Sequence, residues 1–150
     1  MIDAILALNA AHQVETSPLD RAALEAMLDE TFHSATAGGG KDGFIIAFDQ
    51  DAAYDSVNFR WFQSRYERFI YVDRIITAPH ARGRGIARGF YTTLFKAARA
   101  AGHRRIVAEI NVEPPNPASM AFHSALGFAE VGRGEFSDQG KIVSYQECLL

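Results

Sequence analysis

The sequence predicts an α/β protein, a three-layer α/β/α sandwich in which helices cover a mixed sheet. Short apolar runs typical of strands alternate along the chain with longer segments of helical spacing, which is the element order of this fold class. Two short connectors rich in glycine or polar residues, 38–42 and 137–141, lie between apolar runs and are typical of antiparallel hairpins. Because these hairpins are combined with strand–helix–strand connections, we expect a mixed sheet.

Seven segments are expected to be strands because they are short, apolar and bounded by turn residues. The first, residues 2–8, alternates too little to settle its type, but a short apolar run before a polar stretch is consistent with a strand. Alternation along the central segment places every second side chain on one face, and these are Phe69, Tyr71, Asp73, Ile75 and Thr77. The expected strands cover residues 2–8, 31–37, 43–48, 69–78, 105–112, 128–135 and 142–149.

Three segments have the start and stop signals of helices. Two begin with a capping residue followed by proline at the first helical position, at Ser17-Pro18 and Asn116-Pro117. Glycine follows the last periodic residue of the second and third helices, at Gly102 and Gly127. The expected helices cover residues 18–30, 86–101 and 117–126.

Composition and charge limit the class of protein. The 150 residues are expected to form one domain, 1–150, and the single cysteine, Cys148, excludes an internal disulfide and is typical of a reducing compartment. The N-terminal stretch lacks a basic region and is too short and polar for a signal peptide or a membrane span, so we expect a cytoplasmic protein with no membrane contact. The histidines and acidic residues show no metal-ligand spacing, so no metal is expected.

A basic, glycine-containing turn is the most informative stretch. The formal net charge is -3, yet from Arg74 to Ala108 the chain has no acidic residue. Gly83 and Gly85 let the backbone approach a ligand, and the amides and dipole at a helix start favour an anion. A Walker A loop needs Gly-Lys-Ser/Thr, and a dinucleotide loop needs glycine where Arg88 stands. The stretch therefore predicts another kind of loop for a pyrophosphate or a similar anion.

Two motifs, in this order, identify a resemblance. Residues 82–87, Arg-Gly-Arg-Gly-Ile-Ala, match the Arg/Gln-x-x-Gly-x-Gly/Ala signature of the GNAT superfamily of N-acetyltransferases. Residues 116–128 resemble the Asn-x-x-Ser/Ala-x-x-Phe/Leu-Tyr/His-x-x-x-Gly-Phe pattern of the same superfamily, and the stretches 54–71 and 109–116 are similar to a bacterial subgroup of it. This resemblance implies the GNAT, or acyl-CoA N-acyltransferase, fold, in which the sheet is splayed at its centre.

The resemblance also implies a site for acetyl-CoA as co-substrate. In the family, the backbone of the central strand pairs with the pantetheine arm, the amides of the loop hold the pyrophosphate, and the asparagine of the second motif contacts the arm. The arginine side chains of the loop could add charge or could simply be solvated. The expected cofactor-binding residues are Ile75, Ile76, Thr77, Arg82, Gly83, Arg84, Gly85, Ile86, Ala87, Arg88, Asn116 and Ser119.

Transfer to an amine needs a base, because a primary ammonium with a pKa near ~10 is almost fully protonated at pH 7. Asp73 is the first candidate, since the resemblance turns its strand face toward the acceptor and apolar surroundings would raise its pKa, although it could instead pair with an arginine. Glu109 is the second candidate, and a relayed water is a third possibility. His123 replaces a tyrosine thought to protonate the thiolate in many members, so it is either the acid or an ordinary helix histidine.

The resemblance implies an N-acetyltransferase that moves the acetyl group of acetyl-CoA directly to an amine of a small molecule or peptide in a ternary complex. The alternative is a non-catalytic acyl-CoA-binding or sensor module of the same fold. An acidic first quarter argues against a nucleic-acid partner, and a homodimer is an expectation at the level of the family. The acceptor stays open, and the aromatic segment 50–68 either lines its site or only covers the core. The residues expected to line the substrate are Tyr54, Asn58, Trp61 and Tyr71.

Overall fold

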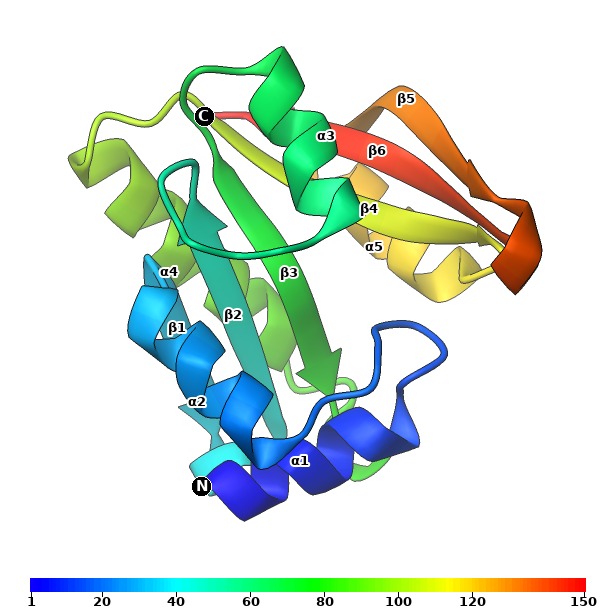
Figure 1. Cartoon of the computed structure of the whole chain (residues 1–150). Helices are drawn as coiled ribbons and strands as arrows, with labels where there is room; N and C mark the ends of the chain where they lie inside the picture. The colour runs from blue at the N-terminus through cyan, green and yellow to red at the C-terminus, as the bar shows by residue number, and fades with distance from the viewer.

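The computed structural model describes residues 1–150 and contains one six-stranded sheet in the order β1-β2-β3-β4-β6-β5 (Figure 1). All neighbouring strands are antiparallel except β3 and β4, which are parallel, so the sheet is mixed as expected. The strands are β1 His33–Ala37, β2 Gly43–Asp49, β3 Ile70–Thr77, β4 Arg105–Glu113, β5 Ala129–Phe136 and β6 Lys141–Leu149. The helices are α1 Ile2–Ala11, α2 Arg21–Glu30, α3 Val57–Arg65, α4 Ile86–Ala100 and α5 Pro117–Leu126.

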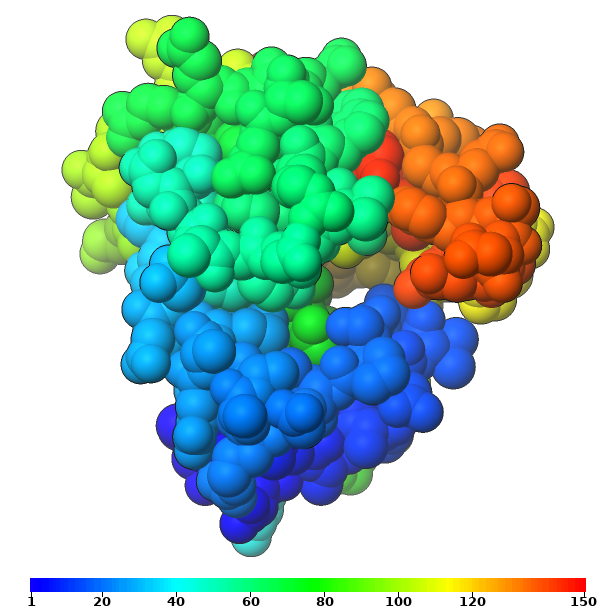
Figure 2. All heavy atoms as spheres, viewed as in Figure 1, coloured from blue at the N-terminus to red at the C-terminus, as the bar shows by residue number.

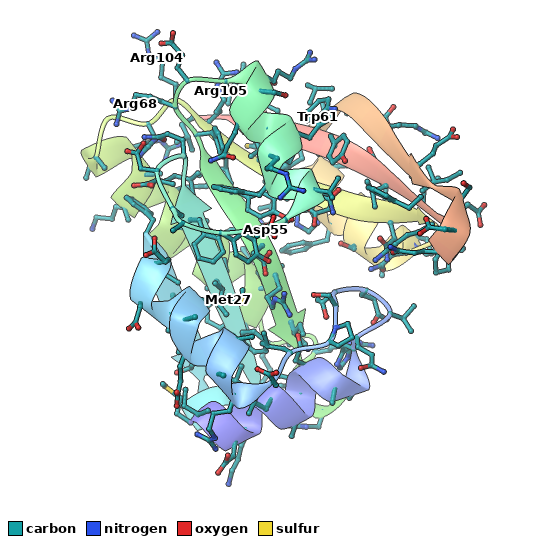
Figure 3. All side chains as sticks on the ribbon, viewed as in Figure 1. Met27, Asp55, Trp61, Arg68, Arg104 and Arg105 are labelled. Carbon is teal, nitrogen blue, oxygen red and sulfur yellow. The ribbon has the colours of Figure 1, made fainter.

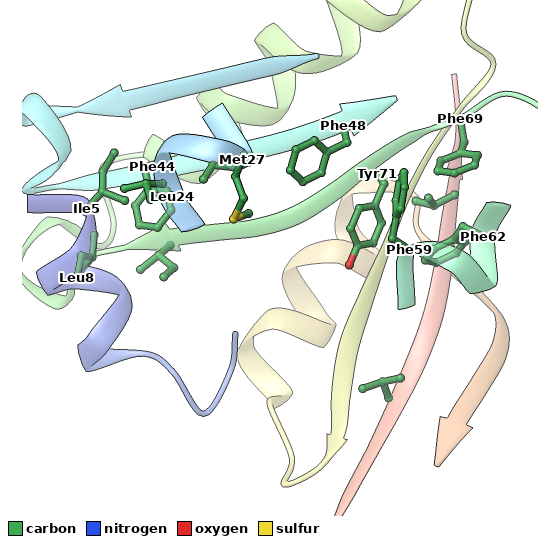
Figure 4. Packing of buried hydrophobic residues seen from close by; sticks show 14 of the residues in the cluster. Ile5, Leu8, Leu24, Met27, Phe44, Phe48, Phe59, Phe62, Phe69 and Tyr71 are labelled. Atoms are coloured by element: carbon green, nitrogen blue, oxygen red, sulfur yellow. The ribbon is translucent and has the colours of Figure 1, made fainter. Parts of the chain in front are cut away.

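Helices cover both faces of the sheet, which confirms the three-layer sandwich. The helices α1, α2 and α3 pack on one face, where their apolar side chains form a core with those of β2 and β3 (Figure 4). The helix α4 covers the other face, and its buried side chains are Phe90, Tyr91, Leu94 and Ala98. None of the helices is both long and apolar enough to cross a membrane.

The sheet is splayed at its centre. The parallel strands β3 and β4 pair only at Ile70 with Ile106 and at Tyr71 with Val107. Beyond these pairs the two strands separate, so the carboxyl half of β3 and the carboxyl half of β4 diverge (Figure 1). The gap opens the sheet between its two helical layers.

A β-bulge in β3 shifts the side chains in its second half to the opposite faces. In the pairing with β2, Val72 and Arg74 lie opposite consecutive residues of β2, so no residue of β2 lies opposite Asp73. Tyr71 and Ile76 would face opposite sides of a regular strand, because an odd number of positions separates them. With the bulge between them, both face the core under α1 to α3. The expectation that Tyr71, Asp73, Ile75 and Thr77 share one face is wrong beyond Asp73, because the extra residue breaks the period of two.

Most of the expected elements are confirmed. Six of the seven expected strands exist with bounds within two residues, and Gly102 and Gly127 follow their helices with positive φ angles. The expected strand at residues 2–8 is wrong, because this segment is the helix α1, whose Ile5 and Leu8 are buried three positions apart on one face.

The expected start of the first predicted helix is also wrong. Asp20, not Ser17, caps α2, since its side chain accepts a hydrogen bond from the amide of Ala23 at 2.8 Å. Ser17 is instead bound by the buried guanidinium of Arg74, which donates to its hydroxyl and to its carbonyl oxygen. This tertiary contact competes with the capping role of Ser17.

Candidate active site

The candidate active site is a cavity of about 710 Å³ in the gap between β3 and β4. Residues from α3, from α4 and from α5 line it, so it passes from one helical layer to the other through the opened sheet. The α1–α2 loop (residues 12–20) and the β5–β6 hairpin border its mouth, and the surface is hollowed between them (Figure 2). The splay of the sheet thus creates the site.

The predicted anion-binding turn, residues 82–87, lies at one end of this cavity, where Arg82 and Ala87 line it. Gly83 and Gly85 have φ angles of 80° and 75°, and open space surrounds the position of a Cβ at either residue, so a ligand can approach the backbone there. Gly85 is the N-cap of α4 and offers no side-chain acceptor. The amides of the first helical turn therefore remain available to an anion. This geometry fits a pyrophosphate, the group that joins the pantetheine arm of coenzyme A to its nucleotide.

The predicted cofactor residues divide into two groups. Gly83, Arg84 and Gly85, in the turn, and Ile86 and Arg88, at the start of α4, lie beside the cavity but do not line it. One lining residue, Thr77, has a buried hydroxyl with no hydrogen-bond partner, which is the kind of unsatisfied group that a ligand can satisfy. The cofactor residues that line the cavity are Ile75, Ile76, Thr77, Arg82, Ala87, Asn116 and Ser119.

Glu109, on β4, presents a carboxylate oxygen without a partner. Its Oε1 accepts hydrogen bonds from the hydroxyl of Tyr71 at 2.9 Å and from Nδ2 of Asn58 at 3.2 Å. Its Oε2 is shielded from solvent and has no partner, although Glu109 as a whole is only half-buried. Burial, and secondarily the charge of Asp73, raise the pKa of Glu109 to about 7. The hydrogen bonds from Tyr71 and Asn58 act in the opposite direction and lower this pKa, but they do not cancel the effect of burial. Such a carboxylate has the properties of a general base near neutral pH.

Asp73, the first candidate base, has both oxygens occupied. Tyr54 donates its hydroxyl proton to Oδ1 at 2.5 Å, and Nε of Arg74 donates to Oδ2 at 2.6 Å. The side chains of Asp73 and Arg74 are only 5% and 4% exposed. This is the arginine pairing that the sequence left open. The role of Asp73 as a base stays a prediction, but the geometry favours Glu109.

His123, the candidate acid, is buried rather than solvated. Its Nδ1 lies 2.8 Å from the carbonyl oxygen of Ser119 and donates to it, so in the neutral ring Nε2 accepts from the hydroxyl of Tyr91 at 2.6 Å. Burial lowers the pKa of His123, which keeps the ring neutral, and raises that of Tyr91. His123 does line the cavity. Its role as an acid stays a prediction, and it requires Nε2 to exchange the Tyr91 hydroxyl for a substrate atom.

The predicted substrate residues are only partly at the cavity. Tyr54 and Asn58 line it, whereas Trp61 and Tyr71 do not. Tyr71 is fully buried and reaches the site through its bond to Glu109, and Trp61 stacks on Tyr145. The other aromatic rings of segment 50–68 mainly cover the core, since Phe59 and Phe62 are fully buried in it.

Several residues at the site were not identified from the sequence. Their signals are weak, because each role depends on pairing between distant strands or loops. The register that places Tyr145 opposite Glu109, for example, follows from the β4–β6 ladder and not from any local motif. The unforeseen residues that line the cavity are Arg74 and Tyr91, together with His12, Glu15 and Lys141 at the mouth, whereas Tyr145 lies outside the cavity, opposite Glu109 on β6.

The sequence profile described as the Acetyltransferase (GNAT) family matches residues 8–128. The match covers most of the chain, including the loop, the splayed strands and α5. The protein therefore belongs to the GNAT acetyltransferase family, and its membership supports an acyltransferase activity. No protein of curated function matches the chain.

Solved structures agree with this assignment of the fold. Ard1 from Thermoplasma volcanium is 14% identical with a TM-score of 0.75, and the alignment covers 99% of this chain and 90% of that one. Ribosomal-protein-alanine N-acetyltransferase from Brucella melitensis is 22% identical with a TM-score of 0.67, over 99% of this chain and 94% of that one. The NatC complex bound to Gag peptide and CoA is 15% identical with a TM-score of 0.72, over 99% and 90%. At these identities the likeness concerns the fold.

Proposed function

We propose that the protein transfers the acetyl group of acetyl-CoA directly to an amine within a ternary complex, with Glu109 as the general base. The observation that carries this proposal is that Glu109, whose buried Oε2 has no partner and whose pKa is raised, lines the same cavity that ends at the predicted anion-binding turn. An enzyme needs both features, whereas a module that only binds acyl-CoA needs the turn alone.

The residues divide the work by their position. The amides from Arg82 to Ala87 hold the pyrophosphate, and the backbone of β3 that β4 leaves unpaired along the gap offers hydrogen bonds to the pantetheine arm. Acetyl-CoA supplies the acetyl group as an activated thioester. Oε2 of Glu109 accepts a proton from the ammonium of the acceptor, which leaves the neutral amine that can act as a nucleophile. The amine nitrogen then forms a bond to the thioester carbon, the carbon–sulfur bond breaks, and the proton that the nitrogen loses is balanced by the one that the departing thiolate takes up to become the thiol. A carboxyl with a pKa of about 7 is ionised in a large fraction of molecules at neutral pH.

The acceptor enters the cavity through its mouth, between the α1–α2 loop and the β5–β6 hairpin, where Glu15 and Lys141 line the cavity. Small amines and peptides with a free N-terminus are both candidates. The likeness of the fold to a ribosomal-protein-alanine N-acetyltransferase and to a complex holding a peptide and CoA is a reason to include peptides.

The proposal is tested first by calorimetric titration with acetyl-CoA. We expect wild-type protein to bind, and Arg82→Glu to bind at least tenfold more weakly, because charge reversal at the turn repels the pyrophosphate without straining the backbone. Gly85→Glu should abolish binding, but because Gly85 has a positive φ, this substitution also strains the backbone, and its effect cannot be assigned to charge alone. Absence of binding to the wild-type protein would contradict the cofactor assignment.

Turnover is then measured as thiol release with a panel of small amines and peptides. For Glu109→Gln we expect unchanged acetyl-CoA affinity and a loss of kcat of about 10²–10⁴-fold, the usual contribution of a general base. Glu135→Gln is the matched control and should retain full turnover, because Glu135 is an exposed residue of β5 that does not line the cavity. Tight acetyl-CoA binding without turnover for any amine would instead support the non-catalytic acyl-CoA-binding module.

A further inference from the structure

Three side chains from α3, β4 and β6 form a hydrogen-bonded chain beside the cavity. The hydroxyl of Tyr145 donates to Oδ1 of Asn58 at 2.8 Å, and Nδ2 of Asn58 donates to Oε1 of Glu109 at 3.2 Å. Tyr145 lies directly opposite Glu109 in the antiparallel β4–β6 ladder. Asn58 bridges two groups that neighbouring strands hold in register.

We infer that Asn58 and Tyr145 are positioning residues for Glu109: Tyr145 fixes the orientation of the Asn58 amide, and Asn58 holds Oε1 so that Oε2 faces the acceptor amine. This inference rests on the proposed function, in which Glu109 is the base. In this role Asn58 and Tyr145 orient the carboxylate of Glu109, which neither lining the substrate site nor covering the core would require of them.

The amide of Asn58 has a donor end and an acceptor end, and only one orientation presents its N–H groups to the carboxylate of Glu109. In the reverse orientation the carbonyl oxygen of Asn58 would face Oε1, which is repulsive when Glu109 is ionised. The hydroxyl of Tyr145 donates to the acceptor end and so favours the productive orientation. Together with Tyr71, Asn58 occupies Oε1 and leaves Oε2 as the oxygen without a partner.

The packing around Tyr145 keeps its hydroxyl in place. Its ring stacks on that of Trp61 with centroids 4.2 Å apart and an angle of 16° between the planes. Trp61 reaches from α3 toward β5 and β6 (Figure 3). Two glycines of β5 make room for this pair: a Cβ at Gly134 would lie 2.6 Å from the Tyr145 hydroxyl, and a Cβ at Gly132 would lie 2.5 Å from the Trp61 ring. The hydroxyl is therefore held by contacts on several sides.

The electrostatic surroundings predict the direction of the effect. Glu109 interacts with the charge of Asp73, which is paired with Arg74, and with the hydroxyl groups of Tyr71, Tyr91 and Tyr145 from β3, α4 and β6. Burial and Asp73 raise the pKa of Glu109, while the hydrogen bonds from Tyr71 and Asn58 lower it. Loss of the Asn58 donor, or of the hydroxyl that orients it, therefore raises this pKa further.

The test compares Tyr145→Phe and Asn58→Ala with the wild-type protein. The titration of Glu109 is followed directly by ¹³C NMR of labelled glutamate carboxyl groups, with Glu109→Gln used to assign the signal. We expect its midpoint to rise by about one pH unit in Asn58→Ala and by about half a unit in Tyr145→Phe, as loss of one hydrogen bond implies. The acid limb of the kcat/KM profile should move by the same amounts.

Tyr66→Phe is the matched control, because it removes a hydroxyl at the end of α3 outside the cavity. It should leave the titration and the pH profile unchanged. An unmoved Glu109 midpoint in both Tyr145→Phe and Asn58→Ala would overturn the inference, even if their stability falls. If Glu109→Gln keeps wild-type turnover, the proposed base is wrong, and the NMR titration alone still decides whether Asn58 and Tyr145 hold the carboxyl.

Discussion

At the scale of single residues, Glu109 links the chemistry of the cavity to the stability of the fold. Its pKa is raised from the ordinary 4.5 to about 7 by burial. The folded protein therefore binds more protons than the unfolded chain between these two values. The stability associated with a neutral Glu109 is fully present below pH 4.5 and is lost as the pH rises through 7. A base of the kind proposed for Glu109 destabilises the folded state at the pH where its ionised form is needed.

Glu109→Gln should therefore make the protein more stable at alkaline pH. Glutamine keeps an acceptor for Tyr71 and Asn58 but has no charge to desolvate. We expect the difference in the free energy of unfolding between variant and wild type to grow from near zero at pH 4 to about 3 kcal/mol at pH 8.5. Urea denaturation at several pH values measures this difference. A difference that does not change with pH would show that Glu109 has an ordinary pKa.

Asp73 and Arg74 form a buried ion pair. Arg74 also donates to Asn9 and Ser17, so this buried guanidinium joins β3 to α1 and to the α1–α2 loop. Arg74→Met would leave the carboxylate of Asp73 buried without its cation, at a cost of about 3–5 kcal/mol. Urea denaturation at pH 7 measures the loss. Arg60→Met, which breaks an exposed pair with Asp55, should cost less than ~1 kcal/mol. Equal losses in the two variants would mean that burial does not distinguish the pairs.

At the scale of elements, the sequence predicted the helices and strands well where local signals agree. The helix α4 combines an apolar face with a glycine stop at Gly102, and its expected bounds differ from the observed ones by one residue. Local signals failed where tertiary contacts compete with them. Ser17 has the chemistry of an N-cap, yet Arg74 binds it. The segment 2–8 was ambiguous because an apolar run of this length suits a strand or a buried helix face.

The candidate site could be predicted only in part. The glycine-containing turn of residues 82–87 is a local motif and was visible in the sequence, whereas the arrangement of carboxylates is not local. The bulge at Asp73 changes which side chains of β3 face the cavity, and no residue type in this stretch indicates a bulge. The sequence placed Asp73 before Glu109 as base because it contains no information on which carboxylate has an arginine and a tyrosine as partners.

Gly132 in strand β5 and Gly89 in helix α4 differ in the space around their Cβ positions. Gly132 lies against the Trp61 ring, so Gly132→Ala should destabilise the protein by about 1–3 kcal/mol through overpacking. Gly89 is exposed within α4 and has open space around its Cβ position, so Gly89→Ala should stabilise by about 0.5–1 kcal/mol. Thermal denaturation of the two variants measures both effects. A stable Gly132→Ala would show that Trp61 can move away from β5.

At the scale of the whole molecule, the cavity divides the sheet into two parts. The strands β1, β2 and β3 form one part and β4, β6 and β5 the other, and only two residue pairs join β3 to β4. The α1–α2 loop spans the opening, since Arg74 of β3 binds its Ser17 and Asn111 of β4 donates to the carbonyl of its Val14 at 3.1 Å. A ligand that occupies the gap contacts both parts at once, and should therefore stabilise the molecule as a unit.

Acetyl-CoA is accordingly expected to raise the free energy of global unfolding. At a concentration 100 times its dissociation constant, a ligand that binds only the folded state contributes about 2.7 kcal/mol. Thermal denaturation with increasing acetyl-CoA measures the shift, and hydrogen exchange should show added protection in both β3 and β4, because the ligand lies between them. Arg82→Glu is the control: if it binds at least tenfold more weakly, the same concentration should contribute about 1.4 kcal/mol or less, with correspondingly less protection, since Arg82 lines the cavity at the turn. Protection limited to β3 would mean that the ligand binds along one strand without bridging the gap, and that the splay serves the acceptor alone.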